Sequence, residues 1–380
     1  MNRFHWLLVL IGMLGSSIAG NLCASAAEPG YAIDQPLPVE ISPADANVRH
    51  VGRFDASDAK QLKYAWPASA ITLHFTGSSL NMKLTDNGNN RHEVIVDGKI
   101  GPVLVPKAGT HLYRLAGDLS PGEHTVTLIK RTEANVGTVG FDGAQLGEGG
   151  KLLPVKPAAH RIEVIGDSIS CGYGNEGANQ NEHFSPATEN ACETYGAITA
   201  RAFDADFVDI AWSGRKMWPN FTIPEIYDRT LPDKSDSKWD FDAYKPEVIL
   251  INLATNDFGQ GNPDEEGWVK AYEQFVAHLR AKNPDATIYL ALGPMMSDGW
   301  PKGQMALSTA RKYINRVVSD RAAKGDMRVH FLEFKPQDAN KDGLGSDWHP
   351  NVKTHQLMAD VFIEAIARDL KWKHIDGAKE

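Results

Sequence analysis

The feature that most constrains the fold is the alternation, after about residue 160, of short apolar strands with longer helical stretches. This alternation predicts an α/β domain with a parallel sheet of about five strands, covered by helices on both faces. Such sheets bind their ligands at the carboxyl ends of the strands, so we expect the chemistry there. The predicted strands are Ile162–Ile165, Asp206–Ile210, Val248–Asn252, Thr287–Leu292 and Arg328–Leu332, and the predicted helices are Tyr195–Phe203, Glu265–Lys282, Gln304–Lys324 and Val352–Asp369.

Residues 46–150 show a different pattern, in which short runs of alternating apolar and polar residues end at Gly, Asn and Pro turns. This pattern predicts an antiparallel β-sandwich, jelly-roll-like in form. The clearest runs are Ile71–Phe75, Leu80–Leu84, Glu93–Val96 and His124–Ile129. We place the sandwich domain at residues 27–150, a linker at 151–160 and the α/β domain at 161–380.

The first residues have the features of a secretory signal peptide. Arg3 supplies a positive charge, Leu7–Leu14 form an apolar core, and Ala24-Ser25-Ala26 is a small-residue cleavage pattern. The apolar run is well short of the ~20 residues that a bilayer span needs. We therefore predict that residues 1–26 are removed and that the protein is secreted or periplasmic.

The charge of the chain excludes two classes of partner. The formal net charge is −9, and it becomes −10 if Arg3 is removed, because residues 1–26 contain no acidic residue. A negative chain without a basic run is a poor ligand for nucleic acid or for an anionic membrane. A neutral substrate fits better, and the sequence leaves the oligomeric state open.

Two cysteines, Cys171 and Cys192, lie beyond the predicted cleavage site. A pair in an exported protein can oxidise. A disulfide would close a loop of about twenty residues and contribute roughly 3 kcal/mol. The alternative is two buried free thiols, and we favour the disulfide.

The candidate nucleophile is Ser168, which follows the first predicted strand of the sheet in Gly166-Asp167-Ser168. A serine there is either a helix N-cap or a nucleophile that needs a base and an oxyanion site. His349 precedes the last predicted helix and is either a capping residue or that general base. His355, inside the same helix, is the competing histidine, and we expect it to be at the surface or structural.

Gly214 and Asn256 follow the second and third predicted strands. Each is an ordinary loop residue by itself. Together with Ser168 and His349, their order resembles the SGNH, or GDSL-like, hydrolase family. The resemblance implies that Ser168 is the nucleophile and His349 the base. It also implies an oxyanion hole made by Ser168 N–H, Gly214 N–H and the Asn256 amide, whose donors are each worth ~10²–10³ in rate.

The sequence departs from that family at the usual position of the triad aspartate, three residues before the histidine, where Ser346 stands. Asp347 is two residues before His349. Either Asp347 orients the imidazole, or a backbone carbonyl does so and the site is a Ser–His dyad. The aspartate fixes the imidazole tautomer and stabilises its charge, and a carbonyl can do the first. We favour the dyad.

A β-sandwich in front of an SGNH domain resembles carbohydrate esterase family 2. The supporting strings are Val51–Asp55, Lys130–Glu133, Gly166–Gly174 and Gly343–Pro350. The resemblance implies a serine esterase that removes acetyl groups from a plant-type polysaccharide of the xylan or glucomannan class, at the 6-O position, without a cofactor. Two alternatives stay open: a short-chain lipase or thioesterase on the same scaffold, and a non-catalytic carbohydrate-binding protein.

Three tryptophans, Trp348, Trp212 and Trp300, fall in predicted strand-end loops. Tryptophan rings cover the apolar faces of sugars, although core packing is the alternative. No His/Cys spacing typical of zinc is present, and the calcium-like run Asp338–Gly343 has His349 where the closing glutamate belongs. We therefore predict substrate contacts from the tryptophans and no metal.

Overall fold

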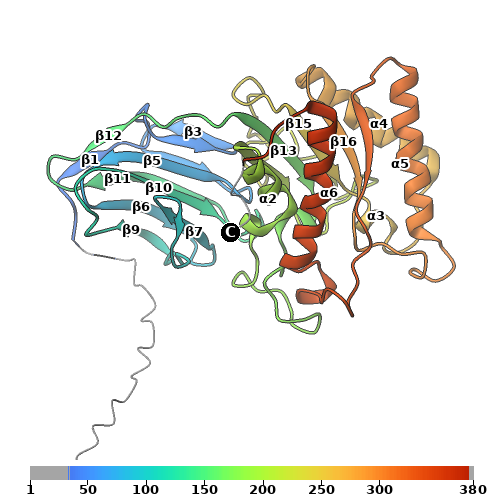
Figure 1. Cartoon of the computed structure of the whole chain (residues 1–380), viewed down its shortest axis with the longest axis horizontal. Coiled ribbons are helices and arrows are strands. Elements are labelled where there is room, and N and C mark those ends of the chain that lie inside the picture. The colour runs from blue at the N-terminus through green and yellow to red at the C-terminus, as the bar shows by residue number, and fades with distance from the viewer. Residues whose placement is uncertain (1–32, 34, 376–380) are drawn as a thin grey trace, which may run out of the picture. The chain divides into compact units, whose positions relative to one another are not determined.

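The computed structural model describes residue 33 and residues 35–375, so the predicted signal peptide lies outside the described residues. Two antiparallel sheets precede a parallel five-stranded sheet with helices, which confirms the predicted fold class (Figure 1). No helix in the range that the structure describes combines the length and the apolar character that a membrane span requires.

The sandwich consists of two six-stranded sheets, in the orders β3-β4-β11-β6-β9 with β1 beside β11, and β12-β5-β10-β7-β8 with β2 beside β5. The strands are β1 (Val39–Ile41), β2 (Arg49–Val51), β3 (Phe54–Asp58), β4 (Gln61–Tyr64), β5 (Ala70–Thr76), β6 (Leu80–Asp86), β7 (His92–Val96), β8 (Lys99–Ile100), β9 (Gly109–Ala116), β10 (Glu123–Lys130), β11 (Val139–Leu146) and β12 (Lys151–Leu153).

The two sheets pack face to face because buried apolar residues alternate with half-buried residues along inner strands such as β5. In β5, Ile71, Leu73 and Phe75 are buried, whereas the residues between them are half-buried. Their side chains join apolar residues of the facing sheet, such as Met82 and Phe141, in one core cluster. Burying one such side chain contributes about 1.5–3 kcal/mol, so a one-residue slip of a strand would expose its whole inner face.

The α/β domain has a parallel sheet in the order β14-β13-β15-β16-β17. Its strands are β13 (His160–Gly166), β14 (Ala205–Ala211), β15 (Val248–Asn252), β16 (Thr287–Leu292) and β17 (Val329–Glu333). Its helices are α1 (Ser168–Cys171), α2 (Tyr195–Ala202), α3 (Thr255–Phe258), α4 (Glu265–Lys282), α5 (Ala306–Ala323) and α6 (Val352–Leu370), with short 3-10 helices η1 (Ala191–Glu193) and η2 (Ser346–Trp348).

Helices cover both faces of this sheet. α2 and α6 pack on one face, and α4 and α5 pack on the other (Figure 1). Every residue of β15 and β16 is buried, as expected for central strands between two helical layers. The carboxyl ends of β13, β14 and β15 lie in register at one edge, because Gly166 pairs with both Ala211 and Asn252.

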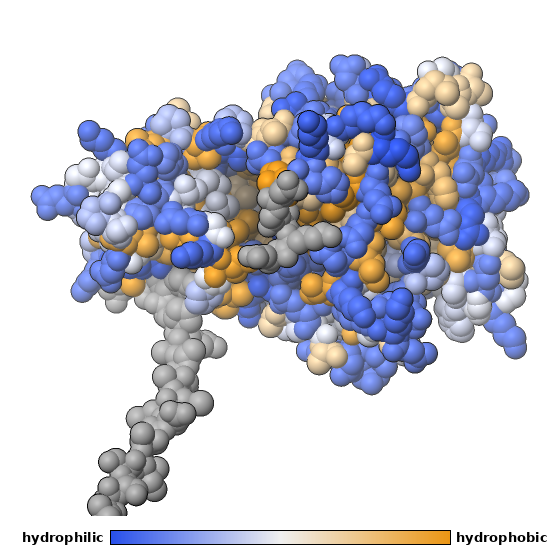
Figure 2. All heavy atoms as spheres, viewed as in Figure 1, coloured by the Kyte–Doolittle hydropathy of each residue, from blue (hydrophilic) through white to orange (hydrophobic). Residues whose placement is uncertain are grey.

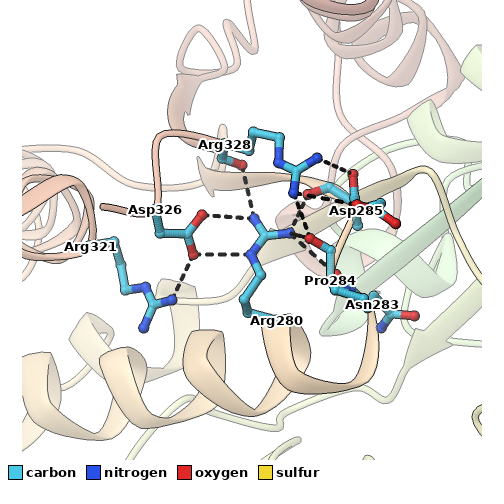
Figure 3. A network of polar contacts seen from close by, with 8 residues as sticks. Arg280, Asn283, Pro284, Asp285, Arg321, Asp326 and Arg328 are labelled. Atoms are coloured by element: carbon cyan, nitrogen blue, oxygen red, sulfur yellow. Dashed lines mark hydrogen bonds and ion pairs between the residues drawn. The ribbon is translucent and has the colours of Figure 1, made fainter. Parts of the chain in front are cut away.

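The opposite end of the sheet is closed by an arginine network (Figure 3). Arg280, in the last turn of α4, donates to both carboxylate oxygens of Asp326 and to the carbonyl of Ala286. Arg321 donates to the same carboxylate at 2.6 Å. The network ties the end of α4 to the turn between α5 and β17, at the amino ends of the strands and away from the Ser168 edge.

The sandwich and the α/β domain form one compact unit within the described residues. Trp66 donates its indole N–H to the carbonyl of Thr230 at 2.9 Å. Arg53 is fully buried, lies 3.6 Å from Glu163 and stacks on the ring of Tyr227. The residues predicted as a linker begin with β12, which pairs with β5, so the sandwich continues to Leu153.

Candidate active site

Ser168 lies where β13 ends and α1 begins. Asp167 is the N-cap of α1, and its carboxylate accepts the N–H of Ile169 at 3.0 Å. Ser168 is therefore the first residue of the helix rather than its cap, and its own N–H has no partner within the helix. Burial raises the pKa of Asp167 to about 7, and the nearby charges of Asp257 and Glu133 act in the same direction.

The structure brings Ser168 and His349 together. Their Oγ and Nε2 atoms are 2.8 Å apart. The other ring nitrogen of His349, Nδ1, lies 3.2 Å from the carbonyl oxygen of Ser346 and 3.1 Å from that of Asp347. Because carbonyls only accept, Nδ1 carries the hydrogen and Nε2 is free to accept from the serine. Burial lowers the pKa of His349 and keeps this neutral form.

The Asp347 carboxylate points away from His349. It accepts hydrogen bonds from the Tyr173 hydroxyl at 2.9 Å, the His183 ring at 2.8 Å and the Phe184 N–H at 2.9 Å. Asp347 has a φ of +48°, a left-handed conformation that turns its own carbonyl toward the imidazole. Within the described residues, the structure thus has the dyad arrangement, with backbone carbonyls behind the histidine.

Tyr173 is a contact that the sequence analysis did not assign, although it lies in the quoted string Gly166–Gly174. Its ring centroid is 4.2 Å from that of His349 and 4.4 Å from that of Phe184. Burial and the Asp347 carboxylate raise the pKa of its hydroxyl, which stays protonated as a donor. The tyrosine therefore fixes the imidazole plane from one side.

Gly214 lies in a turn after β14 that runs from Trp212 to Arg215. The Arg215 N–H donates to the Trp212 carbonyl at 3.3 Å, and Gly214 has a φ of +79°. These features define a type II turn, in which the third position requires a positive φ. Gly214 is exposed, and its N–H has no hydrogen-bond partner among the described residues.

Asn256, in α3, lies beside both of these elements. Its side-chain amide donates to the carbonyl of Arg215 at 3.0 Å and to the Asp167 carboxylate at 3.3 Å. Asp257, the next residue, accepts from Met217 N–H, Trp218 N–H and the Trp268 indole. The structure therefore collects Ser168, Gly214 and Asn256 at one edge of the sheet, with the Asn256 amide held by neighbouring acceptors.

The three predicted tryptophans differ in how far their rings are exposed to solvent, and so to a substrate. Trp348, next to His349, is 59% exposed, and Trp300 is 71% exposed. Trp212 is half-buried against the core, and the Arg215 guanidinium lies 4.7 Å above its ring. Arg215 also lies 4.3 Å from the ring of Phe221, so it separates two aromatic faces. Trp348 and Trp300 keep open ring surface.

The predicted disulfide is wrong: Cys171 and Cys192 are buried free thiols. The Cys171 thiol donates to the Glu133 carboxylate at 3.7 Å. The Cys192 thiol instead lies close enough to Glu93 and Arg131 for their charges to act on its pKa. The intervening loop is closed instead by hydrogen bonds, including that from the Asn175 side chain to the Asn190 carbonyl at 2.9 Å. Burial raises the pKa of both thiols well above their usual value.

The competing histidine, His355, is structural. It is fully buried in α6, and its Nδ1 accepts the N–H of Tyr195 at 3.2 Å. Burial lowers its pKa to about 3, so the ring stays neutral.

One cluster has the donor types of a metal site: the ligand atoms of Glu133, Cys171 and Glu189 lie within 4.8 Å of one another. The carboxylates of this cluster already accept hydrogen bonds from the protein. Ser213 donates to both Glu133 oxygens, at 2.6 and 2.7 Å, and the Glu133 N–H donates to Glu189 at 3.0 Å. The positive charge of Lys130 also acts on both carboxylates.

A cavity of about 810 Å³ lies between the sandwich and α2, with Ile95, Ile129 and Ile198 among its lining residues. Figure 2 shows apolar residues gathered in the region between the two domains. Neither Ser168 nor His349 lines this cavity, so the candidate active site lies elsewhere.

Two family models match the chain. Residues 50–155 match the carbohydrate esterase 2 N-terminal domain, and residues 164–357 match the GDSL-like lipase/acylhydrolase family. The first match falls on the sandwich and the second on the α/β domain.

Similar proteins agree with these matches. The cellulase/esterase CelE of Acetivibrio thermocellus is 40% identical over 89% of this chain, which spans 41% of that longer protein. An acetylxylan esterase/glucomannan deacetylase of Cellvibrio japonicus is 32% identical over 93% of this chain and 96% of its own length. A family two carbohydrate esterase from Clostridium thermocellum, solved with cellohexaose, has 40% identity and a TM-score of 0.81, covering 86% of this chain and 99% of its own.

Proposed function

Because the chain belongs to carbohydrate esterase family 2, we propose that it is an exported serine esterase that removes acetyl groups from a polysaccharide. The observation that carries this proposal is the 2.8 Å contact between Ser168 Oγ and His349 Nε2 at the carboxyl edge of the sheet. The substrate that we propose is an acetylated xylan or glucomannan, deacetylated at the 6-O position.

The reaction begins with transfer of the Ser168 hydroxyl proton to His349 Nε2. The serine oxygen attacks the acetyl carbonyl carbon, and the carbonyl oxygen becomes an oxyanion. The carbonyls of Ser346 and Asp347 hold the Nδ1 hydrogen and so keep Nε2 directed at Ser168. These carbonyls also face the positive charge that the imidazole acquires, in the place where a triad has its aspartate.

We assign three donors to the oxyanion: the N–H of Ser168, the N–H of Gly214 and the Asn256 amide. The Gly214 N–H has no partner within the described residues. The Asn256 amide exchanges its long, 3.3 Å contact with Asp167 for the oxyanion while it keeps the Arg215 carbonyl. The two backbone N–H groups are fixed by the chain before the reaction and need little reorganisation when negative charge develops.

Collapse of this intermediate breaks the bond to the sugar oxygen, which leaves as a hydroxyl with the proton from His349. Water then gives a proton to His349 and attacks the acetyl-serine ester. A second collapse restores Ser168 and releases acetate. These steps balance with water as the co-reactant.

The carbohydrate class rests on the relatives and on the exposed aromatic rings. The similar Cellvibrio protein is named for xylan and glucomannan deacetylation, and the similar Clostridium structure holds cellohexaose. Trp348 and Trp300 offer ring faces of the kind that stack on sugars. Export, to the periplasm or beyond the cell, is proposed from the signal-like residues 1–26.

The test is Ser168→Ala, assayed for acetate release from 4-nitrophenyl acetate, acetylated xylan and acetylated glucomannan. We expect kcat to fall by about 10³ or more, the usual scale for loss of a nucleophile. Ser170→Ala is the matched control, because it removes another buried hydroxyl of α1, which contacts Tyr195 at 2.7 Å. Ser168→Ala with activity within tenfold of wild type would end the proposal.

Two outcomes of the same assays identify the alternative functions. Faster turnover of C8 or longer esters than of acetyl esters would indicate a lipase. Glycan binding that survives Ser168→Ala, in a wild-type protein without esterase activity, would indicate a carbohydrate-binding protein.

A further inference from the structure

The segment Lys130–Glu133 connects the sandwich to the core of the α/β domain. Lys130 is the last residue of β10, and Glu133 is fully buried. The Arg131 carbonyl accepts the N–H of Ala191 at 2.9 Å, and the Glu133 N–H donates to the carboxylate of Glu189 at 3.0 Å. This segment is one of the strings that resemble carbohydrate esterase family 2, and the reaction described above assigns it no role.

The Glu133 carboxylate bridges two parts of the candidate active site. Its Oε1 accepts the Ser213 hydroxyl at 2.6 Å, and its Oε2 accepts the Ser213 N–H at 2.7 Å. Oε2 also accepts the thiol of Cys171 at 3.7 Å. Cys171 ends the short helix that Ser168 begins, and Ser213 immediately precedes Gly214. One side chain of the sandwich therefore contacts both the nucleophile helix and the Gly214 turn.

The direction of the Gly214 N–H depends on Ser213. Type I and type II turns differ by a flip of the peptide between their second and third residues, which here are Ser213 and Gly214. That peptide carries the Gly214 N–H, so the conformation of the turn at Ser213 sets the direction of this donor. Ser213 donates two hydrogen bonds to Glu133, one from its N–H and one from its hydroxyl, and these anchor the residue from which that peptide begins.

The contact between Glu133 and Ser213 is strongest when the Glu133 carboxylate carries its negative charge. Burial raises the pKa of Glu133, whereas the hydrogen bonds from Ser213 and the positive charge of Lys130 act to lower it. In its ionised form the carboxylate accepts from all three donors, the Ser213 hydroxyl, the Ser213 N–H and the Cys171 thiol. Hydrogen bonds to a charged acceptor are about twice as strong as neutral ones. The Lys130 ammonium, held by the carbonyls of Thr132 and Glu133 at 2.6 and 2.9 Å, supplies a positive charge to the same buried region.

We infer that Glu133 is a positioning residue through which the sandwich domain sets the Gly214 N–H relative to Ser168. The inference rests on the proposed function, in which that N–H binds the oxyanion. It gives the sandwich a part in the chemical step, whether or not the sandwich binds glycan.

The first test is Glu133→Ala, assayed with 4-nitrophenyl acetate. A misplaced donor should cost about tenfold to hundredfold in kcat, below the ~10²–10³ for a donor that is removed. KM should stay within twofold, and the acidic limb of the pH profile should not move, because the contact between Ser168 and His349 is intact. Glu133→Gln should recover most of kcat, because its amide can accept from the Ser213 N–H and donate to the Ser213 hydroxyl.

A second variant, Ser213→Ala, keeps Glu133 and removes only the 2.6 Å hydroxyl contact. We expect kcat to fall about threefold to tenfold at unchanged KM, and the double variant with Glu133→Ala to lose no more than Glu133→Ala alone. If Glu133→Ala does not fold, Ser213→Ala and Glu133→Gln decide the inference. Wild-type kcat in Ser213→Ala would then overturn it.

The matched control is Trp66→Phe, which removes another hydrogen bond between the domains, the 2.9 Å contact with Thr230. It should lower the melting temperature and leave kcat unchanged. The inference is overturned if folded Glu133→Ala keeps kcat within twofold, or if Trp66→Phe lowers kcat equally. Ser168→Ala, run in parallel, separates the two proposals, since its full activity would refute the proposed function itself.

Discussion

The contacts of Asp347 lead to a direct test of the dyad. In a triad, the aspartate contacts the imidazole, and replacing it with asparagine costs about 10⁴ in kcat. Here the carboxylate binds Tyr173, His183 and Phe184, and the imidazole is held by backbone carbonyls. The informative change is therefore Asp347→Asn, because it keeps the backbone carbonyl that contacts His349.

The expected loss follows from these contacts. Asparagine tolerates the left-handed conformation, so the φ of +48° at position 347 adds little strain. Its amide oxygen can accept from the Tyr173 hydroxyl and the Phe184 N–H, and its amide nitrogen can donate to a ring nitrogen of His183. All three contacts can persist. We expect kcat/KM to fall by less than about tenfold, which is less than ~1.4 kcal/mol in the activation free energy.

The assay is steady-state hydrolysis of 4-nitrophenyl acetate at neutral pH by wild type, Asp347→Asn and His349→Ala, with melting temperatures measured alongside. His349→Ala should lose about 10³ or more in kcat, because it removes the base. A comparable loss in Asp347→Asn, with a wild-type melting temperature and KM, would refute the dyad and require the carboxylate to reach the histidine during turnover.

Two further predictions concern pH. Burial lowers the pKa of His349 below its usual 6.5, and this effect outweighs the two carbonyl contacts, which raise the pKa. Since the base must be neutral to act, kcat/KM should fall to half of its maximum only below pH 6.5. A midpoint above pH 6.5 in acetate-release assays would contradict this prediction. Burial alone would raise the pKa of Asp326, but the hydrogen bonds from Arg280 and Arg321 lower it below its unfolded value near 4. The carboxylate therefore stabilises the fold fully above the unfolded pKa, and this stabilisation is lost as the pH falls through the lower folded pKa. Asp326→Asn should therefore lower the free energy of unfolding by about 2 kcal/mol at pH 7, less at pH 3, and equal urea midpoints for variant and wild type at pH 7 would exclude the effect.

The α/β domain was predicted well because its apolar runs and its helix-start residues indicate the same elements as the overall alternation of strands and helices. The strands β15 and β16 were predicted with their observed bounds, since buried central strands are continuous apolar runs that end abruptly. α4 was also predicted at both ends, and its N-cap Asp264 and first-turn acids Glu265 and Glu266 are standard helix-start signals. The meeting of Ser168 with His349 followed from their positions after strands of one sheet.

The sandwich was predicted in class but not strand by strand. β11 (Val139–Leu146) was missed because Gly140 and Gly143 interrupt its apolar alternation. Gly143, with a φ of +111°, lies at a register shift against β6, and a side chain there would meet the carbonyl of Ile41. Such a bulge depends on neighbouring strands, so the chain pattern cannot show it.

The contacts between distant segments were the least predictable. The disulfide failed because a spacing of cysteines does not reveal that Glu133, far away in the chain, faces one of the thiols. The direction of the Asp347 carboxylate likewise depends on His183 and Phe184 in a separate loop. Side chains that complete a site from another domain leave no local pattern.

The path of Lys130–Glu133 has a consequence for how such chains are built into larger proteins. A hydrolase core whose interior includes a segment of the preceding module cannot be separated from it at the boundary that the sequence suggests. Where a longer protein contains this pair, as the matched region of the Acetivibrio relative does, recombination should move both modules as one cassette.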